Sequence, residues 1–157
     1  GRAIRMAGYQ NAHSVIASVR KNSSSNNYIQ IQKNSGYRGS DSLMVKHGIS
    51  SGLDFDCIGN TLSKERTKNN LAQQGFLVDR QASALKGAKV NGGSLICQSL
   101  DRQGRIQNTT LMNGIQHLSF EVLPASAGMA FKVMLEMTDG ASIHQKFEQT
   151  FTARNLL

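Results

Sequence analysis

GRAIRMAGY, at residues 1–9, is the segment around which the fold prediction is built. As a helix it would carry Ile4 and Met6 on a short apolar stripe, and its two arginines would project to the other side. Gly8 predicts the end of this helix, because glycine commonly follows the last helical residue. No capping residue precedes Arg2, and so short a helix is not stable alone in water. We therefore expect these residues to be the last part of a longer helix that begins upstream.

The last third of the chain has the clearest strand pattern. Three segments alternate apolar and polar side chains, and they are residues 115–123, 129–138 and 142–152. Alternation with period two predicts strands that have one apolar face. Asn-Gly at 113–114 and Asp-Gly at 139–140 are turn signals before and between them. We expect an antiparallel meander whose apolar face must be covered, and the helix at 1–9 is the available cover.

The middle of the chain is less strongly patterned. Four further strands are expected in it, at residues 28–32, 43–47, 75–79 and 94–100. The run NSSSNN at 22–27 predicts a loop, because serine and asparagine bond their own backbone. Residues 61–74 are polar and predict a surface excursion with a short helix at 71–73. At 157 residues, the chain is expected to form a single domain over residues 1–157.

The charge balance leaves more than one class of partner open. Eighteen Lys and Arg against ten Asp and Glu give a formal net charge of +8. Such a charge permits attraction to DNA, anionic lipid or an acidic protein surface. The basic residues are mostly scattered singly, however, and only the pair at 20–21 and the group at 64–68 cluster. A scattered distribution favours an ordinary solvated surface over a nucleic-acid interface.

Cys57 and Cys97 are the two cysteines of the chain, and they lie 40 residues apart. This spacing is not that of a zinc site or a redox-active dithiol. A structural disulfide is the favoured interpretation, and two buried free thiols in a cytoplasmic protein are the alternative. A disulfide would indicate an oxidising compartment, the periplasm or the cell exterior.

Four segments carry a resemblance to a known family. They are IRMAGYQ at 4–10, Gly-Ser-Asp at 39–41 before a strand, Asp-Cys-x-Gly-Asn at 56–60 followed by the second cysteine, and FTARNL at 151–156. In this order they resemble PilW-type minor pilins of the type IV pilus. The related GspJ-type minor pseudopilins of type II secretion close with a similar strand and are the second candidate.

The resemblance implies an α+β, type IV pilin-like fold, with the truncated N-terminal helix packed on an antiparallel β-sheet. It implies a periplasmic domain whose membrane helix lies upstream, in the inner membrane before assembly and in a cell-surface pilus afterwards. The implied function is that of a structural subunit in pilus assembly or priming, at or near the tip. Other minor pilins and the major pilin would be the partners, with Ile4, Met6 and Tyr9 packing the helix during assembly.

No catalytic site is predicted. The four histidines are separate along the chain, at positions 13, 47, 117 and 144, and no motif of a nucleophile, a phosphate loop or a metalloprotease is present. We expect no enzyme activity, no cofactor, no metal and no small-molecule substrate. A basic adhesin or DNA-binding module at a pilus tip remains the alternative from a different class, and it would bind DNA or an acidic surface weakly.

Overall fold

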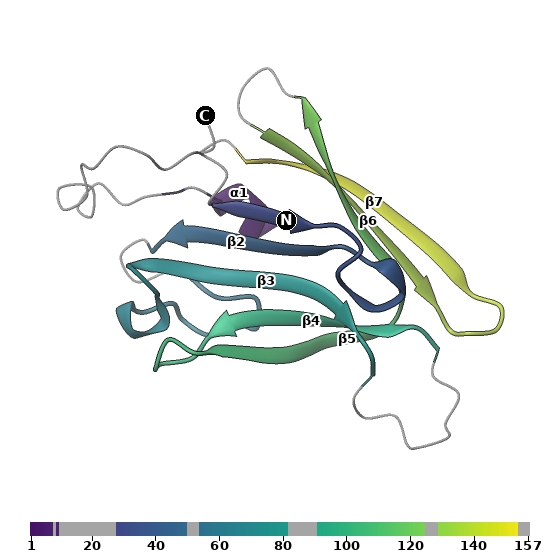
Figure 1. Cartoon of the computed structure of the whole chain (residues 1–157), viewed down its shortest axis with the longest axis horizontal. Coiled ribbons are helices and arrows are strands. Elements are labelled where there is room, and N and C mark those ends of the chain that lie inside the picture. Colours follow the sequence, from purple (N-terminus) through teal and green to yellow (C-terminus); the bar gives the residue numbers. More distant parts are fainter. Residues whose placement is uncertain (8, 10–27, 50–53, 82–90, 125–128, 154–157) are drawn as a thin grey trace.

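The computed structural model describes residues 1–7, 9, 28–49, 54–81, 91–124 and 129–153. In these residues, seven strands form one antiparallel sheet whose order, β1 to β7, is the order of the chain (Figure 1). Their bounds are Ile29–Gln32 (β1), Ser42–Gly48 (β2), Leu71–Asp79 (β3), Gly93–Leu100 (β4), Ile106–Pro124 (β5), Met129–Thr138 (β6) and His144–Ala153 (β7). The helical elements are α1 (Arg2–Met6) and the 3-10 turns η3 (Tyr37–Gly39) and η4 (Lys64–Arg66).

The expected α+β, type IV pilin-like fold is wrong. The helix α1 has five residues, which at 1.5 Å per residue is a rod of only about 8 Å. Such a rod cannot cover the apolar face of a seven-stranded sheet. The sheet instead covers much of that face itself by bending, so that strands from its two halves share one core.

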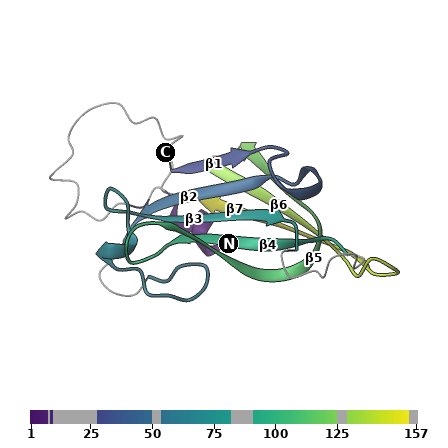
Figure 2. The ribbon, with the colours of Figure 1, turned by 60° about the horizontal axis from the view of Figure 1, so that its bottom comes forward.

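The bend lies in β5, the 19-residue strand that belongs to both halves of the sheet. Its first part pairs with β4 and its second part pairs with β6, and Ile115 takes part in both pairings. Gly114 stands at this switch with a φ of 80°, a backbone conformation that residues with a Cβ rarely adopt. The predicted turn at 113–114 is therefore a bend within one strand. It brings β6 and β7 across the sheet formed by β1 to β4 (Figure 2).

The segment between β1 and β2 closes the bend from the other side. Asp41 donates its backbone N–H to the carbonyl of Leu118 at 2.7 Å, and its carboxylate accepts the Phe120 N–H at 2.9 Å. The Ser40 hydroxyl oxygen accepts the Leu118 N–H at 3.2 Å. Strand β4 begins at Gly93, which pairs with Ile115, so the part of β5 after Ile115 has no partner in β4. The bonds from Ser40 and Asp41 satisfy backbone groups in that part of β5. We call Ser40 and Asp41 the bracket.

Electrostatics holds the bracket in place. Burial would raise the pKa of the Asp41 carboxyl, but bonds from the Lys33 ammonium and from the N–H groups of Phe120 and Asn34 outweigh it and lower that pKa. The Lys33 Nζ lies 2.8 Å from Asp41 Oδ2 and also donates to the Phe120 carbonyl. Asp41 therefore caps the turn, as such a residue commonly does, and at the same time ties that turn to a distant strand.

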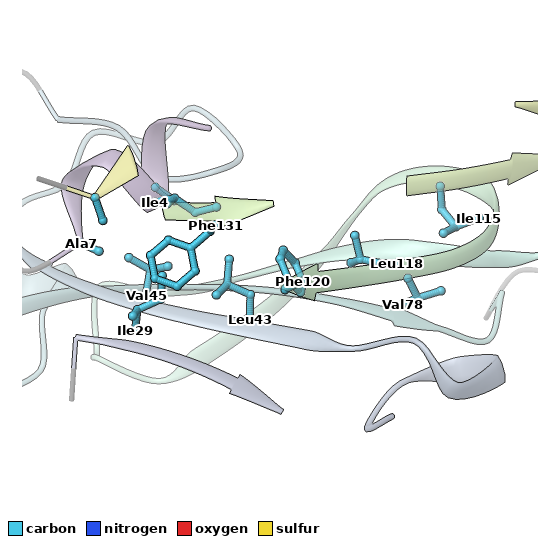
Figure 3. Close-up of a cluster of buried hydrophobic side chains, with 12 residues drawn as sticks. Ile4, Ala7, Ile29, Leu43, Val45, Val78, Ile115, Leu118, Phe120 and Phe131 are labelled. Carbon is cyan, nitrogen blue, oxygen red and sulfur yellow. The ribbon is translucent and has the colours of Figure 1, made fainter. Parts of the chain in front are cut away.

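The core lies inside the bend (Figure 3). Its largest members come from β2, β5, β6 and α1, and they include Ile4, Leu43, Val45, Ile115, Leu118, Phe120 and Phe131. The predicted apolar faces are thus confirmed for Leu118, Phe120 and Phe131, whereas Val133, Leu135 and Met137 are half-buried and pack against this core. Burial is incomplete at two separate points: Val122, near the end of β5, is 50 % exposed, and Phe147, in the middle of β7, is 52 % exposed.

The other strand predictions mostly hold. Strands occur at each of the four expected positions in the middle of the chain, as β1, β2, β3 and β4. The short helix expected at 71–73 is wrong, because β3 begins at Leu71 and pairs there with Gly48 of β2. The loop predicted at 22–27 lies outside the described residues.

Candidate functional site

The helix α1 is seated on the concave face of the sheet, against β2 and β7. Ile4 and Ala3 point into the core and are 3 % and 7 % exposed (Figure 3). The Arg5 guanidinium carbon lies 5.8 Å from the centroid of the Phe151 ring, a cation–π contact with β7. The chain that follows the helix is held by β2, because the Gly48 N–H donates to the Tyr9 carbonyl at 2.5 Å.

An apolar hollow lies beside the start of α1 on the concave face of the sheet. Its volume is about 140 Å³. Its walls carry core and half-buried side chains from β2 to β7, among them Leu43, Phe76, Leu95, Val133, Leu135 and Phe151. The concave face is therefore only partly covered by α1 and keeps apolar surface beside it, where a further apolar segment could pack.

A second hollow, of about 240 Å³, lies on the other side of α1 and is polar in its deeper part. Arg2 of α1 donates to the Asp54 carboxylate at 3.2 Å, and that carboxylate is 7 % exposed. His47 of β2 and Gln74 of β3 lie at its base, with the His47 Nε2 3.1 Å from the Gln74 amide nitrogen. We call Arg2, His47, Asp54 and Gln74 the polar cluster.

His47 is neutral in this setting. Its Nδ1 lies 2.8 Å from the Gly48 carbonyl, which fits a proton on Nδ1 and an Nε2 that accepts from the Gln74 amide. Burial lowers the pKa of His47, together with the Arg2 charge, and the Gly48 carbonyl and Asp54 oppose this only in part. Each group of the polar cluster thus has a partner inside the molecule, and the Arg2–Asp54 pair joins α1 to the segment that carries Cys57.

Cys57, one of the two disulfide cysteines, lines this polar hollow. Cys57 and Cys97 are bonded to each other, with their Cα atoms 6.2 Å apart, so the predicted disulfide is present. Asp56 fixes the loop that carries Cys57, because its carboxylate accepts the N–H groups of Ile58 at 3.1 Å and Asn60 at 2.8 Å. The bond ties this loop to the centre of β4, where Cys97 is fully buried.

A basic group lies at one end of the sheet, where η4 meets the turn between β4 and β5 (Figure 1). The Arg66 guanidinium donates to the Leu100 carbonyl at 3.2 Å, and this bond joins the two segments. The exposed basic residues there are Lys64, Lys68, Arg102 and Arg105. Glu65 and Asp101 are the acidic residues of the same segments, so the end is positive on balance. We call it the basic end.

The outer face of β1 to β4 carries a third hollow of about 340 Å³. Four glutamines are among its lining residues: Gln30, Gln32, Gln73 and Gln98. Gly75 gives it depth, because a Cβ there would lie 2.8 Å from the Gln98 side-chain oxygen and 3.1 Å from the Met44 methyl group. The lining of this hollow is uncharged apart from Lys46 and can offer amide hydrogen bonds, but it places no nucleophile beside a base.

The residues predicted for helix packing take three different positions. Ile4 is a core residue, Met6 is half-buried and lines the polar hollow, and Tyr9 is half-buried with its carbonyl bound to β2. Among the described residues, no group of three or more His, Cys, Asp or Glu could hold a metal ion. No helix within the described residues is long and apolar enough to cross a membrane.

Sequence reasoning missed the polar cluster. His47 was one of four scattered histidines, yet it shares the parity of Leu43 and Val45 on one strand, and that parity predicts an inward direction. Its partners Gln74 and Asp54 carry no such local signal, since register alone brings them to it.

The comparisons with protein-family models, with curated proteins and with solved structures found no match to this chain.

Proposed function

We propose that this chain is a structural subunit of an extracytoplasmic assembly, with a minor pilin of the type IV pilus as the first candidate class. The observation that carries the proposal is the seat of α1. A short amphipathic helix is held in the concave face by Ile4, and apolar surface continues beside it over β5 to β7. Such a surface supports a domain that docks through this helix and its surroundings rather than one that turns over a substrate.

The disulfide supports the compartment in this proposal. A Cys57–Cys97 bond persists in an oxidising environment, such as the periplasm or the cell surface. The four sequence segments that resemble PilW-type minor pilins give the class, and the fold does not contribute to that choice. Other minor pilins, the major pilin and the inner membrane are then the proposed partners, and no catalysis is required.

Gene deletion in the native cell tests this proposal. Loss of surface fibres in electron micrographs, restored by the wild-type gene, is the expected result, with the chain recovered in the sheared fibre fraction. Intact fibres together with lost protein secretion would favour the GspJ-type minor pseudopilin. If neither fibres nor secretion changes, the assembly proposal is wrong.

The basic end favours one second candidate, a module that binds DNA or another polyanion. Lys64, Lys68 and Arg102 are exposed there on segments that are distant in sequence. Binding to duplex DNA should weaken with salt by roughly 0.9 log unit per log unit of salt for each phosphate contacted. The triple change of these three residues to Gln should remove the band shift, and Lys46→Gln on the outer face is the control. A wild-type chain that shifts no DNA at low salt would eliminate this candidate.

A further inference from the structure

Strand β7 has an outer edge with which no other strand among the described residues pairs. It pairs on one side with β6 over its full length. Residues 144–150 are all exposed, and in the rest of the strand only Phe151 is half-buried and Ala153 buried. In an antiparallel strand, alternate residues direct their N–H and C=O groups to opposite sides, so about half of these seven residues direct them away from β6. These groups form a template that can add another strand.

The side chains of this edge also differ from an ordinary polar rim. Phe147 is 52 % exposed on the concave side, and Ile143, just before the strand, is 50 % exposed. On the opposite side Lys146 and Glu148 alternate in sign. Glu148 bonds Lys132 of β6 at 2.8 Å, so the charged side of β7 is ordered.

We infer that β7 pairs with β7 of a second copy of this chain, antiparallel and centred on Phe147. In this register Phe147 meets Phe147 of the second copy across the two-fold axis. Lys146 of each copy lies opposite Glu148 of the other, which makes two charge pairs on the outer side. The paired segment would run from His144 to Thr150, which is the exposed part of the strand.

Charge selects this register over its neighbours. Moving the centre by one residue to either side places Lys146 opposite Lys146, or Glu148 opposite Glu148, and like charges directly opposed are destabilising. A register centred midway between Phe147 and either neighbour places Phe147 opposite Lys146 or Glu148. It also turns the concave side of one copy against the outer side of the other. Among the registers that use the exposed segment, only the one centred on Phe147 is self-complementary in both charge and apolar contact.

The second copy is the occupant that the edge itself specifies. A two-fold contact must be complementary to itself, since each residue meets its partner in both directions. The order Lys146–Phe147–Glu148 has this property, as reversal of the strand brings positive onto negative and ring onto ring. The contact is small, so we expect a reversible dimer that is visible at micromolar concentrations and above.

Sedimentation velocity of the purified whole chain with its disulfide intact tests the inference. The wild-type chain should shift from monomer to dimer as concentration rises. Lys146→Glu and Glu148→Lys should each remain monomeric at all concentrations, because each places like charges in opposition. An equimolar mixture of the two variants should dimerise, because every facing pair between them is opposite in charge. Lys46→Glu, the same charge change on β2, should dimerise like the wild type.

The mixture separates this contact from any other. A wild-type chain that is monomeric throughout overturns the inference. So do single variants that still dimerise, or a mixture of variants that stays monomeric although circular dichroism shows both to be folded. If a single variant does not fold, the double variant K146E/E148K replaces it. This variant again places opposite charges across the two-fold axis and should dimerise with itself. A folded but monomeric double variant overturns the inference as well.

Discussion

Strands β6 and β7 are neighbours of ten residues each, and they differ in what lies beyond them. Strand β6 is paired on both sides, and its Phe131 is 1 % exposed. Strand β7 is paired on one side, and its Phe147 is 52 % exposed although the alternation of its sequence is similar. The comparison teaches that alternation determines which face a side chain takes, whereas neighbouring strands and covers determine whether that face is buried.

The largest expected effect is a direct test of this difference. Phe131→Ala should lower the free energy of unfolding by about 3–5 kcal/mol, because it leaves a cavity in a packed core. Phe147→Ala should change it by less than about 1 kcal/mol, because the ring is half in solvent. Urea unfolding followed by circular dichroism, at a concentration where the chain is monomeric, measures both. Similar values for the two variants would mean that β7 is covered in solution.

The disulfide sharpens the comparison, because it joins the loop that carries Cys57 to β4 and involves neither β6 nor β7. The double variant Cys57→Ser and Cys97→Ser should lose about 2–4 kcal/mol of stability, since its unfolded chain is less constrained. Hydrogen exchange should rise first in the loop that carries Asp56. If hydrogen exchange rose more in β7 than in this loop, the stabilising effect of the disulfide would not be confined to the half of the sheet that contains β4.

The packing of α1 on the sheet should give the next smaller change in the free energy of unfolding. Ile4→Ala should cost about 2 kcal/mol, near the low end for a buried aliphatic side chain, because a five-residue helix can relax around the change. Exchange of the Arg5 amide, which donates to the Gly1 carbonyl at 3.2 Å, reports on the helix itself. Met6→Ala is the matched control on the half-buried side and should cost less.

The smallest effect is a dependence on pH that comes from His47. Its pKa is lowered in the folded state by burial, so the unfolded chain takes up the proton first as pH falls. This contribution to stability is complete above the unfolded pKa of about 6.5 and is lost as pH falls below it, by at most about 1.4 kcal/mol per pH unit. His47→Gln should flatten the change between pH 7.5 and 5.5. An unchanged slope in this variant would place the titration elsewhere.

Much of the sheet could be predicted from the sequence, because its signals are local. The bounds 129–138 of β6 follow from alternation that ends at the turn signal 139–140, and Asp139 confirms this turn by accepting the N–H groups of Ala141, Ser142 and Ile143. The Asn-Gly signal at 113–114 misled, since the same dihedral freedom serves a hairpin turn and a bend. The pairing of β5 with β4 before Gly114 and with β6 after it makes this site a bend. The local sequence does not show which strands pair.

The cover of the apolar face and the polar cluster could not be predicted for a related reason. A periodic helix at 1–9 gave the only visible cover, but the bend at Gly114 brings Phe120 and Phe131 over the core, and no local pattern announces it. The bracket and the His47–Gln74 contact depend on register between strands that lie far apart in sequence. The disulfide was predictable because two cysteines leave a single pairing.

The order of the strands in the sheet, β1 to β7 without a crossover, has a consequence for how the chain reaches its native state. Each strand pairs with the next strand along the chain, and the connections from β4 to β7 are short, so ordering can spread from these hairpins without a costly early loop closure. The bracket links residues that are almost eighty positions apart, so its formation costs more chain entropy than pairing of neighbouring strands. Assembly of the sheet should therefore precede its final curl, and the flat, still open meander would be the species most exposed to aggregation.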